Sequence, residues 1–227
     1  MTWVVVPAAG RGARFGGDVP KQYLDLLGKP VIEHTLRALL AHPSVSGAMV
    51  ALSANDARWP GWRDLDGKPV LTCMGGGERA DSVLAGLRAL PATVADDAWV
   101  LVHDAARPCV KALDLSRLFA ALKADPVGAL LAAPVRDTLK RAGDDGRVAA
   151  TVPRGSMWRA LTPQAFRRDS LVRALESAER AGVLATDEAM AMERLGLQPL
   201  LVEGSEDNLK ITTPADLAVA ESILRRM

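Results

Sequence analysis

Residues 3–23 read WVVVPAAGRGARFGGDVPKQY, and this stretch sets how the chain begins to fold. Its first residues form a short β-branched apolar run, which predicts a buried strand. The strand leads into a loop that contains four glycines and two arginines and ends near Lys21. Glycines let the backbone come close to a ligand, and successive free N–H groups in such a loop bind anions. The stretch therefore predicts a strand followed by a loop suited to a polyphosphate.

The spacing of this loop excludes the two best-known phosphate loops. The residue three positions after Gly12 is Phe15 rather than glycine, so the dinucleotide-binding fingerprint is missing. Gly-Lys-Ser/Thr does not occur in the chain, so there is no Walker A loop. A glycine-rich turn after a first strand can also serve only as a tight connection to a helix. The loop by itself leaves both interpretations open.

Composition limits the kinds of ligand and partner to consider. The chain has 227 residues, of which 49% are hydrophobic and 4% aromatic. That length and an apolar core with few aromatics suit one α/β domain whose sheet is covered by helices. The net charge is +1, which argues against a broad surface for nucleic acid or for an anionic membrane. Positive charge for an anionic ligand must therefore be local.

The reactive residue types indicate a reducing environment. Cys73 and Cys109 lack CxxC spacing, and the three histidines lack the spacing of metal ligands. The N-terminus does not look like a signal peptide. No apolar run approaches the length of about 18 residues that a membrane span needs. We expect a cytoplasmic protein with free thiols and no membrane partner.

Strand-like and helix-like segments alternate along most of the chain, which predicts a Rossmann-like, doubly wound, mostly parallel α/β sheet. Ligands bind such sheets at the carboxyl ends of the strands. Short apolar runs predict strands at 4–6, 48–52, 70–73, 99–102, 129–133, 200–202 and 209–211. Helical spacing of apolar residues predicts helices at about 31–41, 80–90, 113–123, 167–181, 187–195 and 214–225.

The alternation stops between Pro134 and Pro163, where two β-prone arms flank Gly143-Asp-Asp-Gly146. Asp-Gly in a turn between alternating residues predicts a β-hairpin. This stretch has no obvious place in the main sheet, and exposed hairpins with apolar residues tend to find a partner. We therefore expect a single domain over residues 1–227 with a protruding β-arm at about 134–157.

Two further strand ends carry polar clusters. Three glycines, Gly75 to Gly77, precede a predicted helix start, which suggests a backbone held close to a ligand. The strand at 99–102 is followed by Asp104 and, three residues later, Arg107. The two could form only a local salt bridge. An acid at a strand end beside a phosphate loop is also where Mg²⁺ is commonly held, and the loop position favours this functional interpretation.

Taken together, these segments resemble the 2-C-methyl-D-erythritol 4-phosphate cytidylyltransferases of the isoprenoid precursor pathway. The matching segments occur in order along the sequence and are spread over nearly the whole chain. One of them alone would be a weak signal, whereas eight in order are specific. They are Pro7-Ala-Ala-Gly-x-Gly with Arg14, Pro20-Lys-Gln-Tyr23, Gly75-Gly-x-x-Arg-x-Asp-Ser-Val83, His103-Asp-Ala-Ala-Arg-Pro108, Pro134-Val-x-Asp-Thr138, Leu161-Thr-Pro-Gln164, Thr186-Asp-Glu188 and Asn208-x-Lys-Ile-Thr212.

The resemblance implies a nucleotide-diphospho-sugar transferase-like fold and a nucleotidyl transfer. CTP and methylerythritol phosphate would give 4-diphosphocytidyl-2-C-methyl-D-erythritol and pyrophosphate, with Mg²⁺ as cofactor. The nucleophile is a phosphate oxygen, already ionised near neutral pH because the second pKa of a phosphate is about 6. No general base is then needed. The task is to hold two anions together and to stabilise charge that grows on the α-phosphate, which suits cations from separate loops.

The resemblance also implies roles for residues at matching positions. Catalytic roles fall to Arg14 and Lys21, as transition-state stabilisers at the α-phosphate, and to Arg154 and Lys210, which hold the incoming phosphate. The CTP site is expected at Ala8, Ala9, Gly10, Gly12, Gly76 and Ser82, with Asp104 and Arg107 near the ligand and Asp104 on the metal. Further substrate contacts are expected from Thr138, Thr162 and Thr186. Arg154 lies in the arm, which in this family swaps across a homodimer, so the acceptor site would need both subunits.

Two alternatives stay open at this point. The first is a cytidylyltransferase for another polyol phosphate, such as ribitol 5-phosphate, because such enzymes share the first loop and the strand-end acid. The second is a nucleotide-binding protein that keeps the fold without catalysis. Arg14 and Lys21 argue against a pure binder, because a binder gains little from charge that stabilises a transition state.

Overall fold

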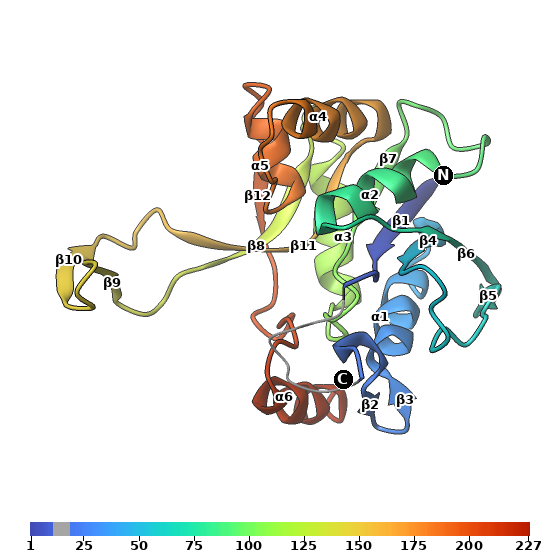
Figure 1. Cartoon of the computed structure of the whole chain (residues 1–227), viewed down its shortest axis with the longest axis horizontal. Helices are drawn as coiled ribbons and strands as arrows, with labels where there is room; N and C mark the ends of the chain where they lie inside the picture. The colour runs from blue at the N-terminus through green and yellow to red at the C-terminus, as the bar shows by residue number, and fades with distance from the viewer. Residues whose placement is uncertain (11–18) are drawn as a thin grey trace.

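The chain forms a central sheet with helices on both faces (Figure 1), and the computed structural model describes residues 1–10 and 19–227. Within that part of the chain, eight strands pair in the order β12-β8-β11-β7-β1-β4-β6-β5. In chain order they are β1 (Thr2–Pro7), β4 (Val45–Leu52), β5 (Asp64–Leu65), β6 (Lys68–Met74), β7 (Trp99–Val102), β8 (Ala129–Pro134), β11 (Trp158–Arg167) and β12 (Leu200–Glu203). β7, β1, β4 and β6 pair in parallel, as do β12 and β8. The predicted doubly wound α/β architecture is confirmed.

β1 lies inside the sheet, which explains its unbroken run of valines. Val4 and Val6 point to one face and Val5 to the other, because side chains alternate along a strand. Helices cover both faces, so neither set of side chains meets water, and all three valines are fully buried. Polar residues do not alternate with the valines because both faces of β1 pack against apolar residues.

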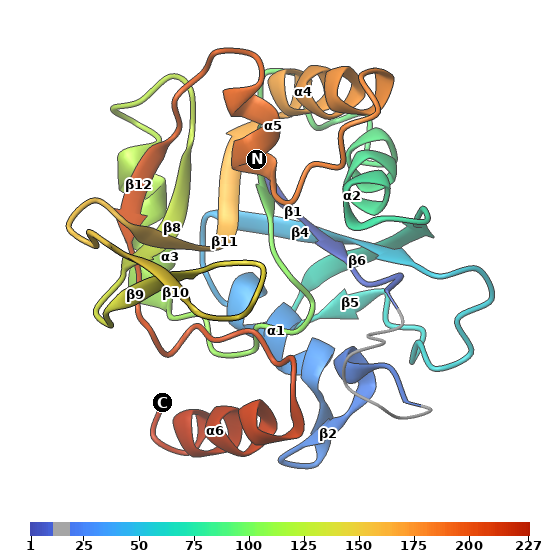
Figure 2. The ribbon, with the colours of Figure 1, turned by 60° about the vertical axis from the view of Figure 1, so that its left-hand side comes forward.

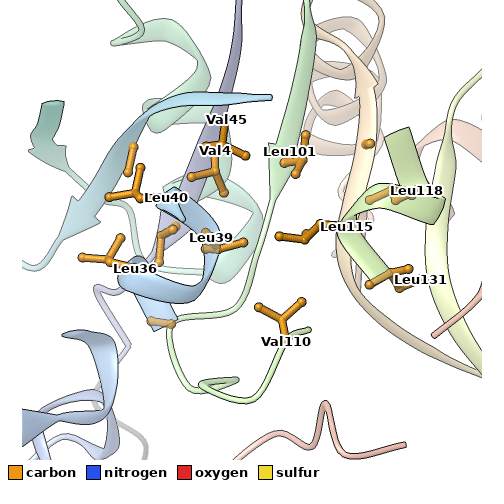
Figure 3. Packing of buried hydrophobic residues seen from close by; sticks show 14 of the residues in the cluster. Val4, Leu36, Leu39, Leu40, Val45, Leu101, Val110, Leu115, Leu118 and Leu131 are labelled. Atoms are coloured by element: carbon orange, nitrogen blue, oxygen red, sulfur yellow. The ribbon is translucent and has the colours of Figure 1, made fainter. Parts of the chain in front are cut away.

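The helices divide between the two faces. α1 (Val31–Leu40) and α3 (Ala112–Ala121) pack with Val4 and Leu101 on one face, where Figure 3 shows their leucines pointing toward the strands. The other face is covered by α2 (Arg79–Arg88), α4 (Arg168–Arg180) and α5 (Glu188–Glu193). The bounds of these helices agree with the predicted ranges to within two residues. None of the helices in the described residues is both long enough and apolar enough to span a membrane.

α6 (Pro214–Leu224) completes a third, smaller apolar cluster. Figures 1 and 2 place it beside β2 (Asp25–Leu26), which pairs with β3 (Lys29–Pro30). Leu26, Cys109 and Ile223 are buried in this cluster. The short 3-10 helix η1 (Lys21–Tyr23) precedes β2. Through this packing the C-terminal helix holds the segment that follows the first loop.

The strand predicted at 209–211 is wrong. These residues form no strand, although Ile211 is fully buried in the third cluster. The Ile211 N–H donates to the carbonyl oxygen of Ala106 at 2.8 Å, and this isolated bond does not extend into a ladder. The apolar run therefore reflects burial under α6 rather than strand pairing.

The end of the stretch 134–163, for which no place in the main sheet is predicted, lies inside that sheet, so this prediction is wrong. Trp158–Arg167 forms β11, which pairs antiparallel with β7 and β8 in the middle of that sheet. Pro163 obscured this strand, because proline inside a run argues against a central strand. The pairing of β11 with β8 shifts register between Ala160 and Gln164, so the proline falls at an irregularity where the ladder is interrupted.

The predicted arm is confirmed as a hairpin. β9 (Leu139–Ala142) and β10 (Val148–Val152) pair antiparallel and form a separate two-stranded sheet. Figure 1 shows this hairpin far from the body of the molecule, joined to it only by the chain on either side. Val148 is 66% exposed at its tip. The arm is thus an extension with no core of its own.

Candidate active site

A cavity of about 290 Å³ opens at the carboxyl ends of β1, β6 and β7. This is where a doubly wound sheet binds its ligands. Its walls come from three loops that are far apart in the sequence, together with Lys21 and Lys210. The lining residues of these loops are Pro7 to Gly10 at the end of β1 and just after it, Gly76 to Arg79 and Ser82 around the start of α2, and Asp104 to Ala106 after β7, and Gln22 lines the cavity beside Lys21.

Gln22 fixes the first loop from behind. Its side-chain Nε2 donates to the carbonyl oxygens of Ala8 and Gly10, at 2.8 and 3.1 Å, and the residue is only 4% exposed. These bonds hold the start of the glycine loop against η1, which carries Lys21 into the cavity wall. Gln22 stands in the Pro20-Lys-Gln-Tyr23 motif, but its role could not be predicted, because its partners are backbone atoms that no side-chain pattern reveals.

Glycines let the first and second loops approach each other. A Cβ on Gly75 would lie 2.8 Å from the Cβ of Ala9, and one on Gly76 would lie 2.3 Å from the Cβ of Asp81. Both distances are too short for a side chain, so the close approach requires glycine. The N–H of Gly76 donates to Ser82 Oγ at 3.1 Å. Gly76 and Ser82 are thus held together at the start of α2, as expected for one wall of a site.

The start of α2 is held by its own capping contacts. Glu78 accepts from the backbone N–H of Asp81, and the side chain of Asp81 accepts from the backbone N–H of Glu78. This reciprocal arrangement satisfies N–H groups that a helix start leaves without partners. Because the first turn is fixed, the side chain of Arg79 leaves the helix in a defined direction, toward Asp104.

Asp104 is the centre of the charge in the cavity. Its Oδ1 accepts from Arg79 Nε at 2.9 Å, and its Oδ2 lies 3.0 Å from Lys210 Nζ and 3.2 Å from Arg107 Nε. Burial alone would raise the pKa of this carboxyl, but Arg79, Lys210 and Arg107 outweigh burial and hold the pKa well below its ordinary range. Asp104 is therefore a carboxylate that gathers three cations.

Arg79 also binds Glu188, through a bidentate pair with 2.6 and 3.1 Å between the nitrogens and oxygens. Burial opposes the charge on Arg79, yet the carboxylates of Glu188 and Asp104 raise its pKa further above the ordinary value. Burial raises the pKa of Glu188, while Arg79 opposes that shift. Neither residue was predicted to have a role, although both stand in motifs of the sequence. Their separation along the chain hid the contact.

His103 is a neutral part of the framework behind Asp104. Thr162 Oγ1 accepts from the Asp104 backbone N–H at 3.1 Å and so donates its own hydrogen to His103 Nδ1, 3.0 Å away. The other ring nitrogen, Nε2, donates to the carbonyl oxygen of Arg107 at 3.0 Å. Complete burial lowers the pKa of His103 to about 4, although the bond to Arg107 opposes this shift. The imidazole is thus neutral at physiological pH.

Asn208 holds the segment that carries Lys210. Its side-chain Nδ2 donates to the Thr162 backbone carbonyl oxygen at 2.7 Å, and the backbone carbonyl oxygen of Asn208 accepts from Arg107 Nη1 at 2.7 Å. The side chain is fully buried. A segment without helix or strand is therefore fixed by hydrogen bonds to two other parts of the site, and it brings Lys210 to Asp104.

The structure brings together most of the predicted site, but not all of it. Gly12 and Arg14 lie outside the described residues. Arg107 and Thr162 are buried behind Asp104, Thr186 is exposed just before α5, and Thr138 and Arg154 are exposed in or beside the arm. The predicted residues that line the cavity are Ala8, Ala9, Gly10, Lys21, Gly76, Ser82, Asp104 and Lys210.

Comparisons with known proteins agree with this geometry. Residues 2–226 match the family described as 2-C-methyl-D-erythritol 4-phosphate cytidylyltransferase. A relative of that name from Stenotrophomonas maltophilia (strain R551-3) is 66% identical over 224 residues, which cover 99% of this chain and 97% of the relative. One from Xanthomonas axonopodis pv. citri (strain 306) is 64% identical, over 95% of this chain and 81% of the relative.

Solved structures agree at lower sequence identity. The Francisella tularensis 2-C-methyl-D-erythritol 4-phosphate cytidylyltransferase superposes with a TM-score of 0.83 at 34% identity, covering 98% of this chain and 99% of that one. The enzyme of the same name from Thermus thermophilus gives a TM-score of 0.78 at 33% identity, with 98% of each chain covered. The similarity thus extends along the whole length in both sequence and structure.

Proposed function

The chain belongs to the 2-C-methyl-D-erythritol 4-phosphate cytidylyltransferase family, and from that premise we propose how its residues share the work of the reaction. It joins CTP and 2-C-methyl-D-erythritol 4-phosphate into 4-diphosphocytidyl-2-C-methyl-D-erythritol and releases pyrophosphate. The relatives do not favour ribitol 5-phosphate as the acceptor or a role without catalysis. One observation supports placing the reaction in this cavity. Lys21, Arg79 and Lys210 all line it, together with glycines of two loops.

The reaction is a displacement at phosphorus. An oxygen of the acceptor phosphate forms a bond to the α-phosphorus of CTP, and the bond from that phosphorus to the oxygen bridging to the β-phosphate breaks. The electron pair of the broken bond leaves with pyrophosphate, so no proton transfer is required. Lys21 would stabilise charge on the α-phosphate, with Arg14 as its expected companion outside the described residues. Lys210 would hold the acceptor phosphate, and the neutral His103 supports Asp104 without acting as a base.

Asp104 has the chemistry to hold a divalent ion such as Mg²⁺. Its Oδ2 already meets two cations, whereas its Oδ1 accepts a single hydrogen bond from the described residues and keeps a lone pair for a metal. No group of three or more His, Cys, Asp or Glu residues in the described ranges forms a metal cage. An ion at Asp104 would thus take most of its oxygen ligands from phosphates and water, as Mg²⁺ usually does. When bound, it would neutralise charge on the triphosphate.

The arm supports a proposal about assembly. Thr138 and Arg154 are expected on the acceptor side of the site, yet neither lines the cavity of its own chain. Arg154 is exposed, and its guanidinium donates to the Arg136 carbonyl oxygen. The arm extends from the body (Figure 1). We propose that the chain forms a homodimer in which each arm reaches the partner's cavity, so that Thr138 and Arg154 act in trans.

Mixed dimers test this arrangement. A Lys21→Ala subunit has a damaged cavity and an intact arm, while an Arg154→Ala subunit has the reverse. If the arm acts in trans, mixing the two impaired variants restores activity at methylerythritol phosphate concentrations far below the raised KM of Arg154→Ala, because each heterodimer contains one site with both parts intact. Random exchange in a two-fold dimer should restore roughly a quarter of the wild-type sites. If mixing restores nothing although the subunits exchange, the arm acts within its own chain.

Substrate choice tests the function itself. The purified chain is supplied with CTP, Mg²⁺ and either methylerythritol phosphate or ribitol 5-phosphate, and pyrophosphate release is measured. We expect turnover with methylerythritol phosphate to be much the faster. Faster use of ribitol 5-phosphate would overturn the acceptor assignment. Binding of CTP with no release from any acceptor would instead favour a protein without catalysis.

We also propose a cytoplasmic location. Cys73 and Cys109 are both free thiols, and Cys109 is buried, which suits a reducing compartment. Fractionation of the source cells with an antibody against the chain would test this. Recovery in the membrane pellet or outside the cytoplasm would contradict it.

A further inference from the structure

We propose that Glu188 is a positioning residue for the reaction: it holds the guanidinium of Arg79 in one orientation at the cavity wall. The proposal rests on the function assigned above, since it concerns the same cavity. Arg79 lines that cavity, whereas Glu188 does not. Glu188 therefore acts through Arg79 rather than by contact with a substrate.

The contact between the two residues is strongly directional. Arg79 Nη1 donates to Glu188 Oε1 at 2.6 Å, and Arg79 Nη2 donates to Glu188 Oε2 at 3.1 Å. The two parallel bonds fix the plane of the guanidinium as well as its place, which a single ion pair would not do. The Glu188 side chain is 1% exposed, while 25% of the Arg79 side chain remains open. The carboxylate is the fixed partner, and the guanidinium is the part that reaches the cavity.

Glu188 is itself anchored by the main sheet. Its neighbour Asp187 caps α5 by accepting from the Met190 backbone N–H at 2.9 Å. Gln164 of β11 donates through Nε2 to Asp187 Oδ2 at 2.9 Å and accepts the Ala189 backbone N–H at 2.8 Å. The residues on both sides of Glu188 are thus held by one buried side chain of the central sheet. This makes Glu188 a rigid support for a residue that belongs to α2.

The orientation of Arg79 matters because three cations share the two oxygens of Asp104. With Glu188 holding both Nη atoms, Arg79 reaches only Oδ1, through Nε, and leaves Oδ2 to Lys210 and Arg107. Without Glu188, the guanidinium is free to turn and pair with both oxygens of Asp104, as guanidinium and carboxylate groups prefer. That turn would displace Lys210, one of the predicted catalytic cations. Glu188 therefore keeps the charges of the cavity apart and available to phosphates.

A double-mutant cycle tests this inference. Glu188→Gln, Arg79→Ala and the double variant are compared with wild type for kcat, for both KM values and for the calorimetric Kd of CTP. Glu176→Gln is the matched control, because Glu176 pairs with Arg88 at 2.8 Å on the exposed surface. We expect Glu188→Gln to lower kcat/KM for CTP by about tenfold or more, the scale of lost support for a ligand-binding group, and the control to stay within about twofold of wild type. In the Arg79→Ala background, Glu188→Gln should cause no further loss, because it acts through the residue already removed.

Two results would overturn the proposal. One is a loss in the double variant equal to the product of the two single losses, which would show that Glu188 acts independently of Arg79. The other is a Glu188→Gln enzyme within about twofold of wild type in every constant, the scatter expected of independent surface changes. Circular dichroism and thermal unfolding identify a variant that does not fold. In that case Glu188→Asp replaces it, since aspartate keeps the charge but is too short for the bidentate pair, and the same loss through Arg79 is expected.

The same experiment separates failure of this inference from failure of the proposed function. Turnover of the wild type with CTP and methylerythritol phosphate is measured first and tests the function alone. If the wild type were inactive, the calorimetric Kd of CTP would still show whether Glu188→Gln weakens the nucleotide site through Arg79. An unchanged Kd in that case would count against Glu188, and a weakened one would support it.

Discussion

The cavity and the arm hold their functional residues in opposite ways. In the cavity, Asp104 is buried among three cations and supported by His103, Thr162 and Asn208, all of which are buried in the body of the protein. In the arm, Thr138 and Arg154 are exposed, and the hairpin makes its ladder contacts only with itself. The described residues of the cavity are therefore held in place by other parts of the same chain. The hairpin of the arm pairs with no other described strand.

The difference shows where a single chain can preorganise charge. Ordering the buried side chains of the cavity costs conformational entropy, and the folding of the surrounding core offsets that cost. The cavity is therefore formed before any ligand binds. An exposed arm lacks that support, and in the homodimer that we propose the partner subunit would fix its residues. The predictions that follow test this contrast, in order of expected effect.

The largest effect is expected at Lys21. Lys21→Ala removes a positive charge from the cavity wall, where we propose that the α-phosphate binds, and should lower kcat by about 10²–10³, while CTP binding changes far less. Steady-state kinetics together with the Kd of CTP provide the measurement. Lys123→Ala, at an exposed position of the body, is the control. A change confined to the KM for CTP would show that Lys21 serves ground-state binding and that the cavity is less specialised than we infer.

Arg154 should give a smaller loss of a different kind. Arg154→Ala in the arm should raise the KM for methylerythritol phosphate by roughly 10- to 100-fold, the value of a hydrogen bond to a charged group, and leave CTP binding intact. Arg141→Ala, which removes the same charge elsewhere in the arm, is the control. If both arginines prove equal, the arm contributes only a general positive field. An unchanged KM would remove Arg154 from the acceptor site.

Acid should destabilise the framework of the cavity through His103. The pKa of His103 is 6.5 in the unfolded chain and about 4 in the folded chain. Below pH 6.5 the unfolded chain therefore binds a proton that the folded chain does not bind until the pH approaches 4. Stability from this residue is full above pH 6.5 and falls as the pH drops toward 4. Between pH 7.5 and pH 5 the loss should be about 2 kcal/mol.

Urea unfolding of wild type and His103→Gln at a fixed protein concentration checks this loss. The variant should show a weaker pH dependence over the same range, although His42, whose pKa burial also lowers, contributes in the same direction in both proteins. Equal slopes in the two proteins would mean that His103 does not carry the effect.

The smallest effect is expected at Gly146, in the turn of the arm. Gly146 has φ +75 and open space around it, so Gly146→Ala strains only the hairpin turn. Because the arm does not pack on the body, global unfolding should change by less than about 0.5 kcal/mol. Gly128→Ala is the contrasting variant, since Gly128 has φ +125 and a Cβ there would lie 2.4 Å from the Ala165 carbonyl oxygen. Equal losses in the two variants would show that the arm is energetically part of the body.

Sequence patterns predicted the parts of the fold that depend on neighbouring residues. The valine run gave β1, helical spacing gave α1 and α2, and Asp-Gly gave the hairpin. The patterns failed where tertiary contacts overrode local preference. Pro163 concealed β11, which tolerates the proline at a register shift, and the apolar residues around Ile211 suggested a strand where the chain is buried without pairing.

The contacts of the site likewise include some that motifs predicted and some that only tertiary packing determined. Glycines and an acid at strand ends predicted that Ala8 to Gly10, Gly76 and Asp104 would meet, because strand ends share one edge of a parallel sheet. The place of Lys210 in the site was implied only by the family resemblance. No such rule links Gln22 to backbone carbonyls or Arg79 to Glu188. These contacts depend on the packing of η1 against the first loop and of α5 near α2.

The amino-acid sequence alone establishes the class of this protein: an alternating α/β chain with a phosphate loop, strand-end acids and the ordered motifs of one cytidylyltransferase family. That information is local, since it lies in backbone preferences and short spacings. The tertiary structure alone shows that Arg79 joins two carboxylates, Asp104 and Glu188, at distances of 25 and 109 residues along the chain. Which charges meet in the interior depends on how separate elements pack, and no short pattern encodes that. The opening stretch thus contributes backbone atoms and Lys21 to the cavity. The other described cations of the site, Arg79, Arg107 and Lys210, are those that pair with Asp104.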